Sequence, residues 1–254
     1  MSSHANDTHT PSTYLVIGAG GGIGRALARQ LAADGATLYL AGRNPEGLDA
    51  ISEETGGTAV VCDATDFEAV GALMERIKGE AGKLDGVAHL AGSLLLKPAH
   101  LTSEEEYRQT IETNLTSAFA VVRSSVKVMG SGGSIVLMST AAARTGIANH
   151  EAIAAAKAGV TGLALSAAAT YGPRGIRVNV VAPGLVETPL TARLVSNEAS
   201  RKASESMHAL GRLGQPEEVA SAISWLLHPA QGWVTGQILG VDGGLATLRT
   251  KARA

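Results

Sequence analysis

The sequence predicts an α/β domain built on a doubly wound parallel sheet. Short apolar runs that suit buried strands alternate with longer segments whose apolar residues recur at helical spacing. The 254 residues are enough for one large domain with a substantial core, and no linker or internal repeat divides them. We expect one domain over residues 13–254, preceded by a polar, disordered lead at residues 1–12.

Residues 14–34 predict the first strand, a glycine-rich turn and the first helix. An apolar run at 14–17 is the strand, and apolar residues then recur at helical spacing, at Ile23, Leu27 and Leu31. This order suits the pyrophosphate of a dinucleotide, because backbone N–H groups and the dipole at a helix start attract phosphate and glycine permits close approach. A flexible glycine-rich loop is the alternative. The residues expected to contact the dinucleotide here are Gly18, Gly22, Ile23 and Gly24.

The turn after the second predicted strand concerns the ribose of such a dinucleotide. The strand covers residues 37–41 and the turn covers residues 42–45. An acidic residue in this place pairs with a free ribose 2′-hydroxyl, whereas an arginine accepts a 2′-phosphate. The turn contains Arg43 and no carboxylate, which favours NADP(H) over NAD(H). The alternative is an ordinary surface arginine.

Asp63 follows the third predicted strand, at 58–62, which comes after a short helix at 45–54. Ligands collect at the carboxyl ends of strands in open α/β sheets, so this carboxylate is placed to accept a hydrogen bond from an adenine amino group. Its alternative role is to cap the next helix, at 66–80. Asp66 is also well placed as that N-cap, which leaves Asp63 freer.

The remaining elements continue the alternation. A fourth strand at 84–90 ends in Ala91-Gly92, and a helix starting at Thr102 or Ser103 runs to about residue 129. Asn114 lies inside that helix, where asparagine is a poor helix former, so it indicates a specific role. The later segments are a strand at 134–138, a long helix at 150–171 capped by Asn149, a strand at 176–182, a mobile helical lid at about 188–213, a helix at 216–227 and a last strand at 237–241.

Composition limits the classes of function. The net charge of −2 gives no bulk attraction to nucleic acid, and no apolar run approaches the length of a membrane span. The first twelve residues lack the apolar stretch of a signal peptide. Cys62 is the only cysteine, so no intramolecular disulfide can form, which fits a cytoplasmic protein. No metal site is predicted.

Taken together, the ordered motifs resemble the short-chain dehydrogenase/reductase family over residues 13 to 245. The matching segments are Gly18-x3-Gly22-x-Gly24, the Asp63 turn, Ala91-Gly92, Asn114-Leu115, Ser139-Thr140, Lys157, Arg177-Val178-Asn179-Val180, Pro183 to Thr188, Thr235-Gly236-Gln237 and Val241-Asp242-Gly243-Gly244. The resemblance implies a Rossmann-type domain with seven parallel strands, NAD(P) binding and commonly a homotetramer. It adds further residues to the expected cofactor contacts, namely Ala91, Gly92, Lys157, Val186 and Thr188.

The chain departs from the family at the residues that handle the proton. Family members usually carry a tyrosine four residues before the lysine, and here that position is Ile153. The family serine falls on Thr140 by its spacing, although Ser139 is adjacent. The Asn-Asn-Ala-Gly that follows strand four in the family is His89-Leu90-Ala91-Gly92. Isoleucine neither donates nor accepts a proton, and losing a positioned general acid costs about 10²–10⁴-fold in rate.

The residues expected in the catalytic site are therefore Asn114, Thr140 and Lys157, with His150 as a candidate replacement for the tyrosine. His150, Ile153 and Lys157 are spaced to share one helical face. The resemblance implies that Lys157 binds the nicotinamide ribose, Thr140 holds a substrate oxygen and Asn114 anchors a proton chain. A surface role for His150 is the alternative, and Tyr107, His89 and His100 are candidates without supporting spacing.

These observations lead to three hypotheses. The first is an NADP(H)-preferring oxidoreductase that reduces a carbonyl or imine on a small organic substrate, or runs the reverse reaction, with altered proton delivery. The second is an NADP(H)-binding regulatory or partner subunit without turnover. The third is a non-redox lyase or isomerase with His150 as base. The helix at 152–169 is apolar all round, which, with the resemblance, predicts a homo-oligomer, a tetramer or a dimer.

Overall fold

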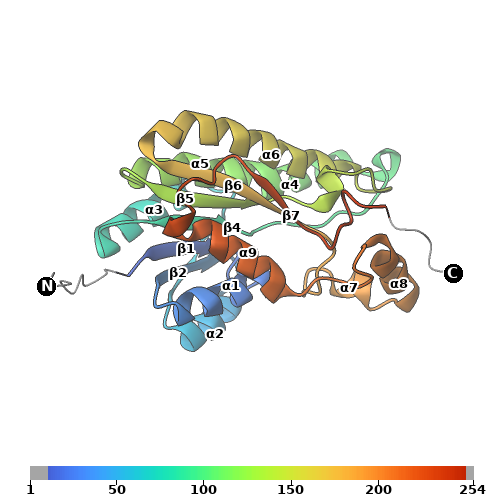
Figure 1. Ribbon diagram of the computed structural model, residues 1–254, viewed down its shortest axis with the longest axis horizontal. Coiled ribbons are helices and arrows are strands. Elements are labelled where there is room, and N and C mark those ends of the chain that lie inside the picture. Colours follow the sequence, from blue (N-terminus) through green and yellow to red (C-terminus); the bar gives the residue numbers. More distant parts are fainter. Residues whose placement is uncertain (1–10, 250–254) are drawn as a thin grey trace, which may run out of the picture.

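A single sheet of seven parallel strands organises the computed structural model, which describes residues 11–249 (Figure 1). The strand order is β3-β2-β1-β4-β5-β6-β7, so the direction of progression reverses between β1 and β4. The strands are β1 (Thr13–Ile17), β2 (Thr37–Gly42), β3 (Thr58–Val61), β4 (Gly86–His89), β5 (Gly133–Met138), β6 (Ile176–Pro183) and β7 (Ile238–Val241). The predicted fold class is confirmed. Most of the N-terminal lead expected at 1–12 lies outside the described residues.

Helices cover both faces of this sheet. The helices are α1 (Gly22–Ala33), α2 (Pro45–Thr55), α3 (Phe67–Ala81), α4 (Glu104–Ile111), α5 (Ser117–Val128), α6 (Glu151–Tyr171), α7 (Ala192–Val195), α8 (Glu198–Met207) and α9 (Pro216–Leu227). Along β1, Leu15 and Ile17 join the core formed with α3, α5 and α6, while Tyr14 and Val16 join the core formed with α1, α2 and α9. This alternation follows from the two-residue period of a strand and places helices on both sides.

Several helix starts follow the predicted chemistry. The carboxylate of Asp66 accepts from the backbone N–H groups of Glu68 and Ala69 and so caps α3. Ser103 and Glu106 form a capping box at the start of α4. Pro216 occupies the first turn of α9. Each of these starts is specified by residues within the first turn of its own helix.

The helix predicted from 102 or 103 to about 129 is divided into α4 and α5 by a π-helical turn at Glu112–Thr116. The predicted helical span and the place of Asn114 within it are present, but the π turn in the middle was not predicted. Asn114 lies in this π turn, and its side chain is buried. Single π turns are frequent at functional sites, because the extra residue redirects a side chain.

The predicted cap of the long helix was wrong. The N-cap of α6 is His150, whose side chain makes no capping hydrogen bond, and Asn149 lies one position earlier with a φ of 65°. Asparagine tolerates the left-handed backbone conformation that Asn149 adopts here. Asn149 therefore turns the chain before the helix rather than capping it.

One helical segment, Glu151–Arg174, is long and apolar enough by length and composition to cross a membrane. The expectation that no segment approaches that length was wrong on this point. In the structure α6 packs against β5 and β6, and 44% of its most apolar window is buried. Its small apolar residues thus form part of the core on one side and remain accessible on the other.

The predicted lid contains two short helices, α7 and α8, followed by the segment leading to α9. Figure 1 shows them projecting at one end of the molecule, beside the end at which the chain terminates. His208, immediately after α8, connects the lid to the turn after β6 by two hydrogen bonds. Its Nδ1 bonds the Ser204 carbonyl oxygen at 2.7 Å, and its Nε2 accepts from the Leu185 N–H at 3.2 Å. The expected mobility of this lid remains a prediction.

Candidate functional site

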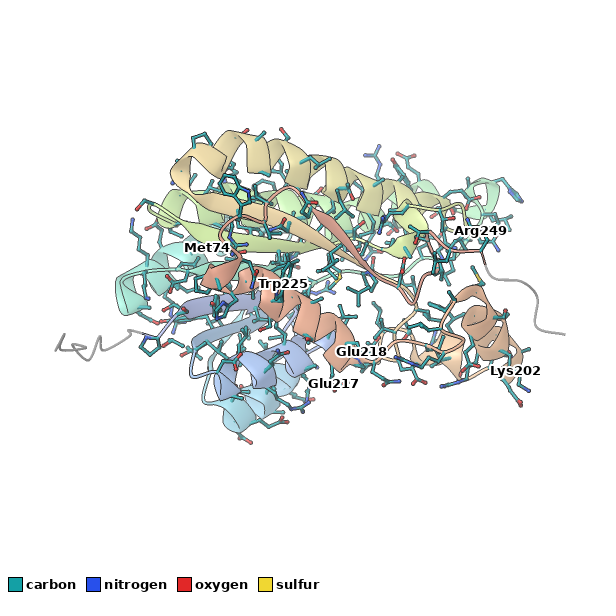
Figure 2. The ribbon with its side chains drawn as sticks, viewed as in Figure 1. Met74, Lys202, Glu217, Glu218, Trp225 and Arg249 are labelled. Atoms are coloured by element: carbon teal, nitrogen blue, oxygen red, sulfur yellow. The ribbon has the colours of Figure 1, made fainter. Side chains whose placement is uncertain are left out.

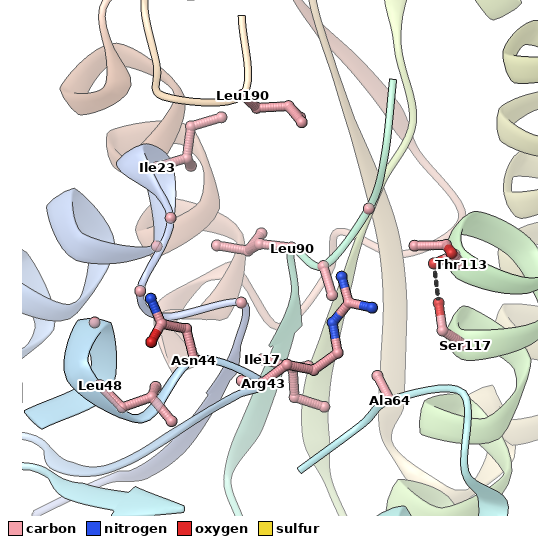
Figure 3. Close-up of a pocket in the computed structure, with 18 of the residues that line it drawn as sticks. Ile17, Ile23, Arg43, Asn44, Leu48, Ala64, Leu90, Thr113, Ser117 and Leu190 are labelled. Carbon is pink, nitrogen blue, oxygen red and sulfur yellow. Dashed lines mark hydrogen bonds between the residues drawn. The ribbon is translucent and has the colours of Figure 1, made fainter. Parts of the chain in front are cut away.

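A cavity of about 340 Å³ opens at the carboxyl ends of the strands, where the strand order reverses (Figure 3). Open α/β sheets bind ligands at this reversal because two neighbouring loops diverge there. The glycine turn after β1, residues 42–44 after β2, residues 62–65 after β3, residues 90–92 after β4 and residues 188–190 of the lid line it. Figure 3 shows Ile23 of α1 and Leu190 of the lid at one end of the cavity.

The start of α1 leaves backbone donors at this cavity. Its N-cap, Gly21, provides no side-chain hydrogen bond, and its first turn has no acidic residue. By contrast, the start of α3 is satisfied by Asp66. The first N–H groups of a helix have no partner within the helix, so those of Gly22, Ile23 and Gly24 remain open to an anion. Arg25 braces the turn by donating to the carbonyl oxygens of Gly20 and Gly47.

The glycines of the turn are required by space as well as by conformation. Gly18 has a φ of 86°, and a Cβ on it would lie 2.8 Å from the Ala91 nitrogen. A Cβ on Gly24 would overlap the Gly18 carbonyl oxygen. A Cβ on Gly22 would lie 2.9 Å from Cγ2 of Thr188. Gly22 therefore makes room for the lid, in addition to any role in approaching a phosphate.

Arg43 and Asp63 reach the cavity from neighbouring strand ends. Arg43 is exposed, and Figure 3 shows its guanidinium extending from the end of β2 into the cavity. Both hydrogen bonds to the Asp63 carboxylate come from Thr65 and end on Oδ1, at 3.0 Å from the backbone N–H and 2.9 Å from the hydroxyl. The Thr65 bonds, and to a lesser extent the Arg43 charge, lower the pKa of Asp63. Oδ2 is thus an ionised acceptor open to a ligand.

Asn114 is held in the π turn by three hydrogen bonds. Its Nδ2 donates to the Thr110 carbonyl and the Ser93 hydroxyl, both at 2.9 Å, and its Oδ1 accepts from the Ser93 N–H at 3.2 Å. A Cβ on Gly92 would lie 2.9 Å from Oδ1 of Asn114 and 3.4 Å from Nζ of Lys157. The structure therefore brings Gly92, Asn114 and Lys157 together.

Lys157 is buried on α6, and its ammonium donates to the Met138 carbonyl oxygen at 3.0 Å. Burial lowers its pKa to about 8, because a charged amine is costly away from water. The hydroxyl of Ser139 is 2% exposed and donates to the Lys157 carbonyl, whereas Thr140 is partly exposed at the start of the following loop. Of the two neighbouring hydroxyls, only that of Thr140 is accessible.

The other two expected residues on α6 lie differently. Ile153 is buried, with 3% of its surface exposed. His150 lies outside the helix as its N-cap, so the helical spacing does not place its ring on the face of Ile153 and Lys157. The ring Nδ1 bonds the Ala148 carbonyl oxygen at 2.8 Å. Since that oxygen only accepts, Nδ1 carries the proton in a neutral ring and Nε2 is an acceptor.

His89, at the end of β4, had no supporting spacing in the sequence, yet the structure joins it to the site. Its Nε2 lies 2.9 Å from the Ser117 hydroxyl, which donates to the Thr113 carbonyl at 2.7 Å. Ser117 and Thr113 both line the cavity, and Figure 3 shows the bond between them. Because the Ser117 proton is used, His89 donates from Nε2, and Nδ1 has no partner among the described residues. Burial, and secondarily the Lys157 charge, lowers the pKa of His89 to about 3.

Val186 and Thr188 complete the expected cofactor contacts. Val186 is buried and pairs with Gly214 in an isolated bridge. The hydroxyls of Thr188 and Thr191 lie 3.2 Å apart, and Thr188 lines the cavity. Ala91 and Gly92 line it as well. Within the described part of the chain, no group of three or more His, Cys, Asp or Glu residues is arranged to hold a metal.

Comparison with known proteins agrees with this geometry. Residues 18–246 match the family model described as enoyl-(acyl carrier protein) reductase. The chain is 37% identical to 2,5-dichloro-2,5-cyclohexadiene-1,4-diol dehydrogenase of Sphingobium indicum, covering 93% of this chain and 97% of that protein. It is 41% identical to cis-4-hydroxycyclohexanecarboxylate dehydrogenase of Sinomonas cyclohexanicum, covering 91% and 94%.

A solved structure of a variant of actinorhodin polyketide ketoreductase with NADPH superposes with a TM-score of 0.89. It is 28% identical in sequence, and the match covers 94% of this chain and 98% of that one. The matched model, the extent of these relatives and the shared sheet agree with one another. The chain belongs to the short-chain dehydrogenase/reductase family and is an oxidoreductase with a nicotinamide-cofactor fold.

Proposed function

We propose that this oxidoreductase uses NADP(H) in preference to NAD(H) and transfers the proton without the usual tyrosine. Its reaction is the reduction of a carbonyl or imine on a small organic substrate, or the reverse oxidation. The observation that carries the proposal is the open start of α1 beside Arg43, in a cavity that Gly92 also lines. Gly92 in turn lies next to the side chains of Asn114 and Lys157.

The residues at this cavity fit a dinucleotide that carries a 2′-phosphate. The uncapped N–H groups of α1 and the absence of Cβ atoms at Gly18 and Gly24 suit a pyrophosphate. Arg43 supplies a positive charge for the 2′-phosphate, and Oδ2 of Asp63 is an acceptor for the adenine amino group. When bound, the nicotinamide would supply or accept the hydride.

The chain's own residues divide the remaining work. Lys157 and Thr188 would hold the nicotinamide half, with Ala91, Gly92 and Val186 beside it, and the accessible Thr140 hydroxyl would hold the substrate oxygen. Asn114, fixed by Ser93 and Thr110, would keep the Lys157 surroundings ordered. Since Lys157 has a pKa of about 8, it is largely charged at neutral pH and readily gives up its proton just above it.

His150 remains the proposed proton-handling residue because it lies three residues before Ile153, not because of a shared helical face, and its Nδ1 hydrogen bond favours one direction of the reaction. With Nδ1–H donating to Ala148, neutral His150 presents Nε2 as a base. A base serves alcohol oxidation better than carbonyl reduction, which needs an acid. Two relatives are by name dehydrogenases of ring alcohols. We therefore favour a small cyclic alcohol and its ketone as the substrate pair.

The oligomer is a further part of the proposal. One face of α6 packs on the sheet, while Leu165 on the same helix is 46% exposed and Trp225 on α9 is also 46% exposed. Since α6 and α9 pack on opposite faces of the sheet, these two side chains offer two separate places for contact with another copy. We propose that the protein forms a dimer or tetramer and that it acts in the cytoplasm. Sedimentation of the purified protein tests the oligomeric state.

The test is a titration of purified protein with NADPH and with NADH, followed by turnover of a panel of cyclic alcohols with NADP⁺ and of ketones with NADPH. Tighter binding of NADPH and slow turnover that falls about 100-fold in His150→Ala support the proposal. Failure of both nucleotides to bind sinks it. Turnover of generic ketones at rates ordinary for the family contradicts the altered proton transfer.

A second candidate is an NADP(H)-binding partner subunit without turnover, because Ile153 is buried where a proton donor is expected. The same experiment separates it: binding without turnover of any substrate supports this candidate. The lyase or isomerase hypothesis predicts activity that needs no nucleotide and is lost in His150→Ala.

A further inference from the structure

A second cavity, of about 350 Å³, is lined in part by the loop that follows Thr140. Its lining comes from the loop between Thr140 and His150, the end of the lid and the segment after β7. Among the lining residues are Thr145, Ile147, Met207, Leu245, Leu248 and Arg249. Because two of these three segments are the loop before α6 and the lid, the cavity borders the region where a substrate would enter.

A small apolar cluster connects this cavity to Thr140. Ala141, the residue directly after Thr140, packs with Leu245 and Ala246, and Ile147 packs against them. Leu245 and Ile147 also line the cavity. The floor of the cavity is therefore continuous with the loop that carries the proposed substrate-oxygen donor.

The lining combines apolar side chains with the hydroxyls of Thr145 and Ser206, and one end is cationic. Met207 is 47% exposed and Leu248 is 57% exposed, so their apolar surface is available to the carbon skeleton of a ligand. Arg249 is the one charged residue in the lining. Figure 2 shows it near the end of the described chain. No carboxylate pairs with it within residues 11–249.

The Arg249 guanidinium is anchored without being saturated. Nη1 donates to the Leu248 carbonyl at 2.9 Å and more loosely to the Leu245 carbonyl, and Nη2 donates to the Thr145 hydroxyl at 3.2 Å. Arginine has five N–H donors, so two remain without an acceptor in the described part of the chain. A planar anion such as a carboxylate fits two donors of one guanidinium.

We infer that this cavity is the distal half of the substrate site and that it selects a small substrate carrying a carboxylate, which Arg249 binds. The inference rests on the proposed function and narrows its substrate class. The apolar side chains of the lining, among them Met207 and Leu248, receive the hydrocarbon ring, and the carboxylate lies at the Arg249 end, away from Thr140. Arg249 is thus a specificity-determining residue and takes no part in the chemistry.

The experiment compares an acid with its neutral ester on the purified full-length protein. Calorimetry measures the binding of cis-4-hydroxycyclohexanecarboxylate and of its methyl ester. We expect the acid to bind about tenfold more tightly, since charge-assisted hydrogen bonds are the stronger class. Arg249→Gln should abolish this preference, and Arg249→Lys should retain part of it because the charge remains.

Lys202→Gln is the matched control. Lys202 lies on α8 at the same end of the molecule, pairs with Glu198 and does not line the cavity, so its loss removes one positive charge without touching the site (Figure 2). The acid preference should persist in it. Equal affinity for acid and ester in the wild type, including no measurable binding of either, overturns the inference. So does a preference that survives Arg249→Gln. Nucleotide titration, run separately, reports on the proposed function alone.

Discussion

At the glycine turn the backbone itself forms the binding surface, whereas at the start of α6 the chemistry depends on single side chains. Gly18 and Gly24 have no room for a Cβ, and α1 offers its N–H groups through geometry alone. Ile153 and His150, in contrast, occupy their positions without determining the path of the chain. A backbone-made site resists change because any substitution disturbs the fold, while a side-chain-made site can lose or exchange its chemistry and leave the fold intact.

The largest expected effect is a gain of ketone-reducing activity after a substitution on α6. Ile153→Tyr places a phenol four residues before Lys157, and we expect ketone reduction with NADPH to rise by about 100-fold or more, as a positioned general acid provides. NADPH consumption measures it. Ile153→Phe fills the same buried space without a hydroxyl and should give no gain. A tyrosine variant that folds and performs no better than the phenylalanine variant contradicts the proposed vacancy.

The next effect concerns the backbone-made side. Gly18→Ala drives a Cβ to 2.8 Å from the Ala91 nitrogen at a positive φ, so we expect the free energy of unfolding to fall by about 1–3 kcal/mol and NADPH affinity to fall with it. Gly71→Ala is the control, because a Cβ there meets nothing within 4 Å inside α3. Denaturant titration should show it about 0.5–1 kcal/mol more stable than wild type. Equal behaviour of the two variants would contradict the steric argument.

A third prediction uses the pH dependence of His89, which lies between the two regions. The pKa of His89 is about 3 in the folded protein, against 6.5 for an unperturbed ring. As the pH falls below about 6.5, the ring is therefore protonated in the unfolded chain but stays neutral in the folded chain. Stability is therefore lost on acidification through this window. Between pH 7 and pH 5 the wild type should lose about 2 kcal/mol more than His89→Asn. Parallel stability curves for the two proteins would show that the ring accepts a proton in the native state.

The smallest effect is at the exposed Arg43. Arg43→Gln should weaken NADPH binding about tenfold and leave NADH binding nearly unchanged, because only the former carries the 2′-phosphate. Fluorescence titration with both nucleotides measures the change. Arg108→Gln, at an exposed residue of α4 paired with Glu104, controls for loss of a surface charge. Equal weakening of both nucleotides by Arg43→Gln would refute the preference for NADP(H).

Much of the molecule was determined by local sequence. The alternation of apolar runs and helical periodicity gave all seven strands, and the cap residues Asp66 and Ser103 marked helix starts that the structure contains. The glycine turn was predicted from the order strand, turn, helix. These features depend on conformational preferences and hydrogen bonds within a few residues, so the local sequence is sufficient to specify them.

Other features were decided only when distant segments packed together. The π turn at Asn114 depends on Ser93, 21 residues away, and the burial of Ser139 depends on the Lys157 carbonyl. The need for glycine at position 22 comes from Thr188 of the lid, which leaves no room for a Cβ. The cavity around Arg249 exists because the segment after β7 lies beside the loop that follows Thr140. Sequence spacing carries no signal for such contacts, because they are fixed by the packing of helices on the sheet and by the need to satisfy buried polar groups.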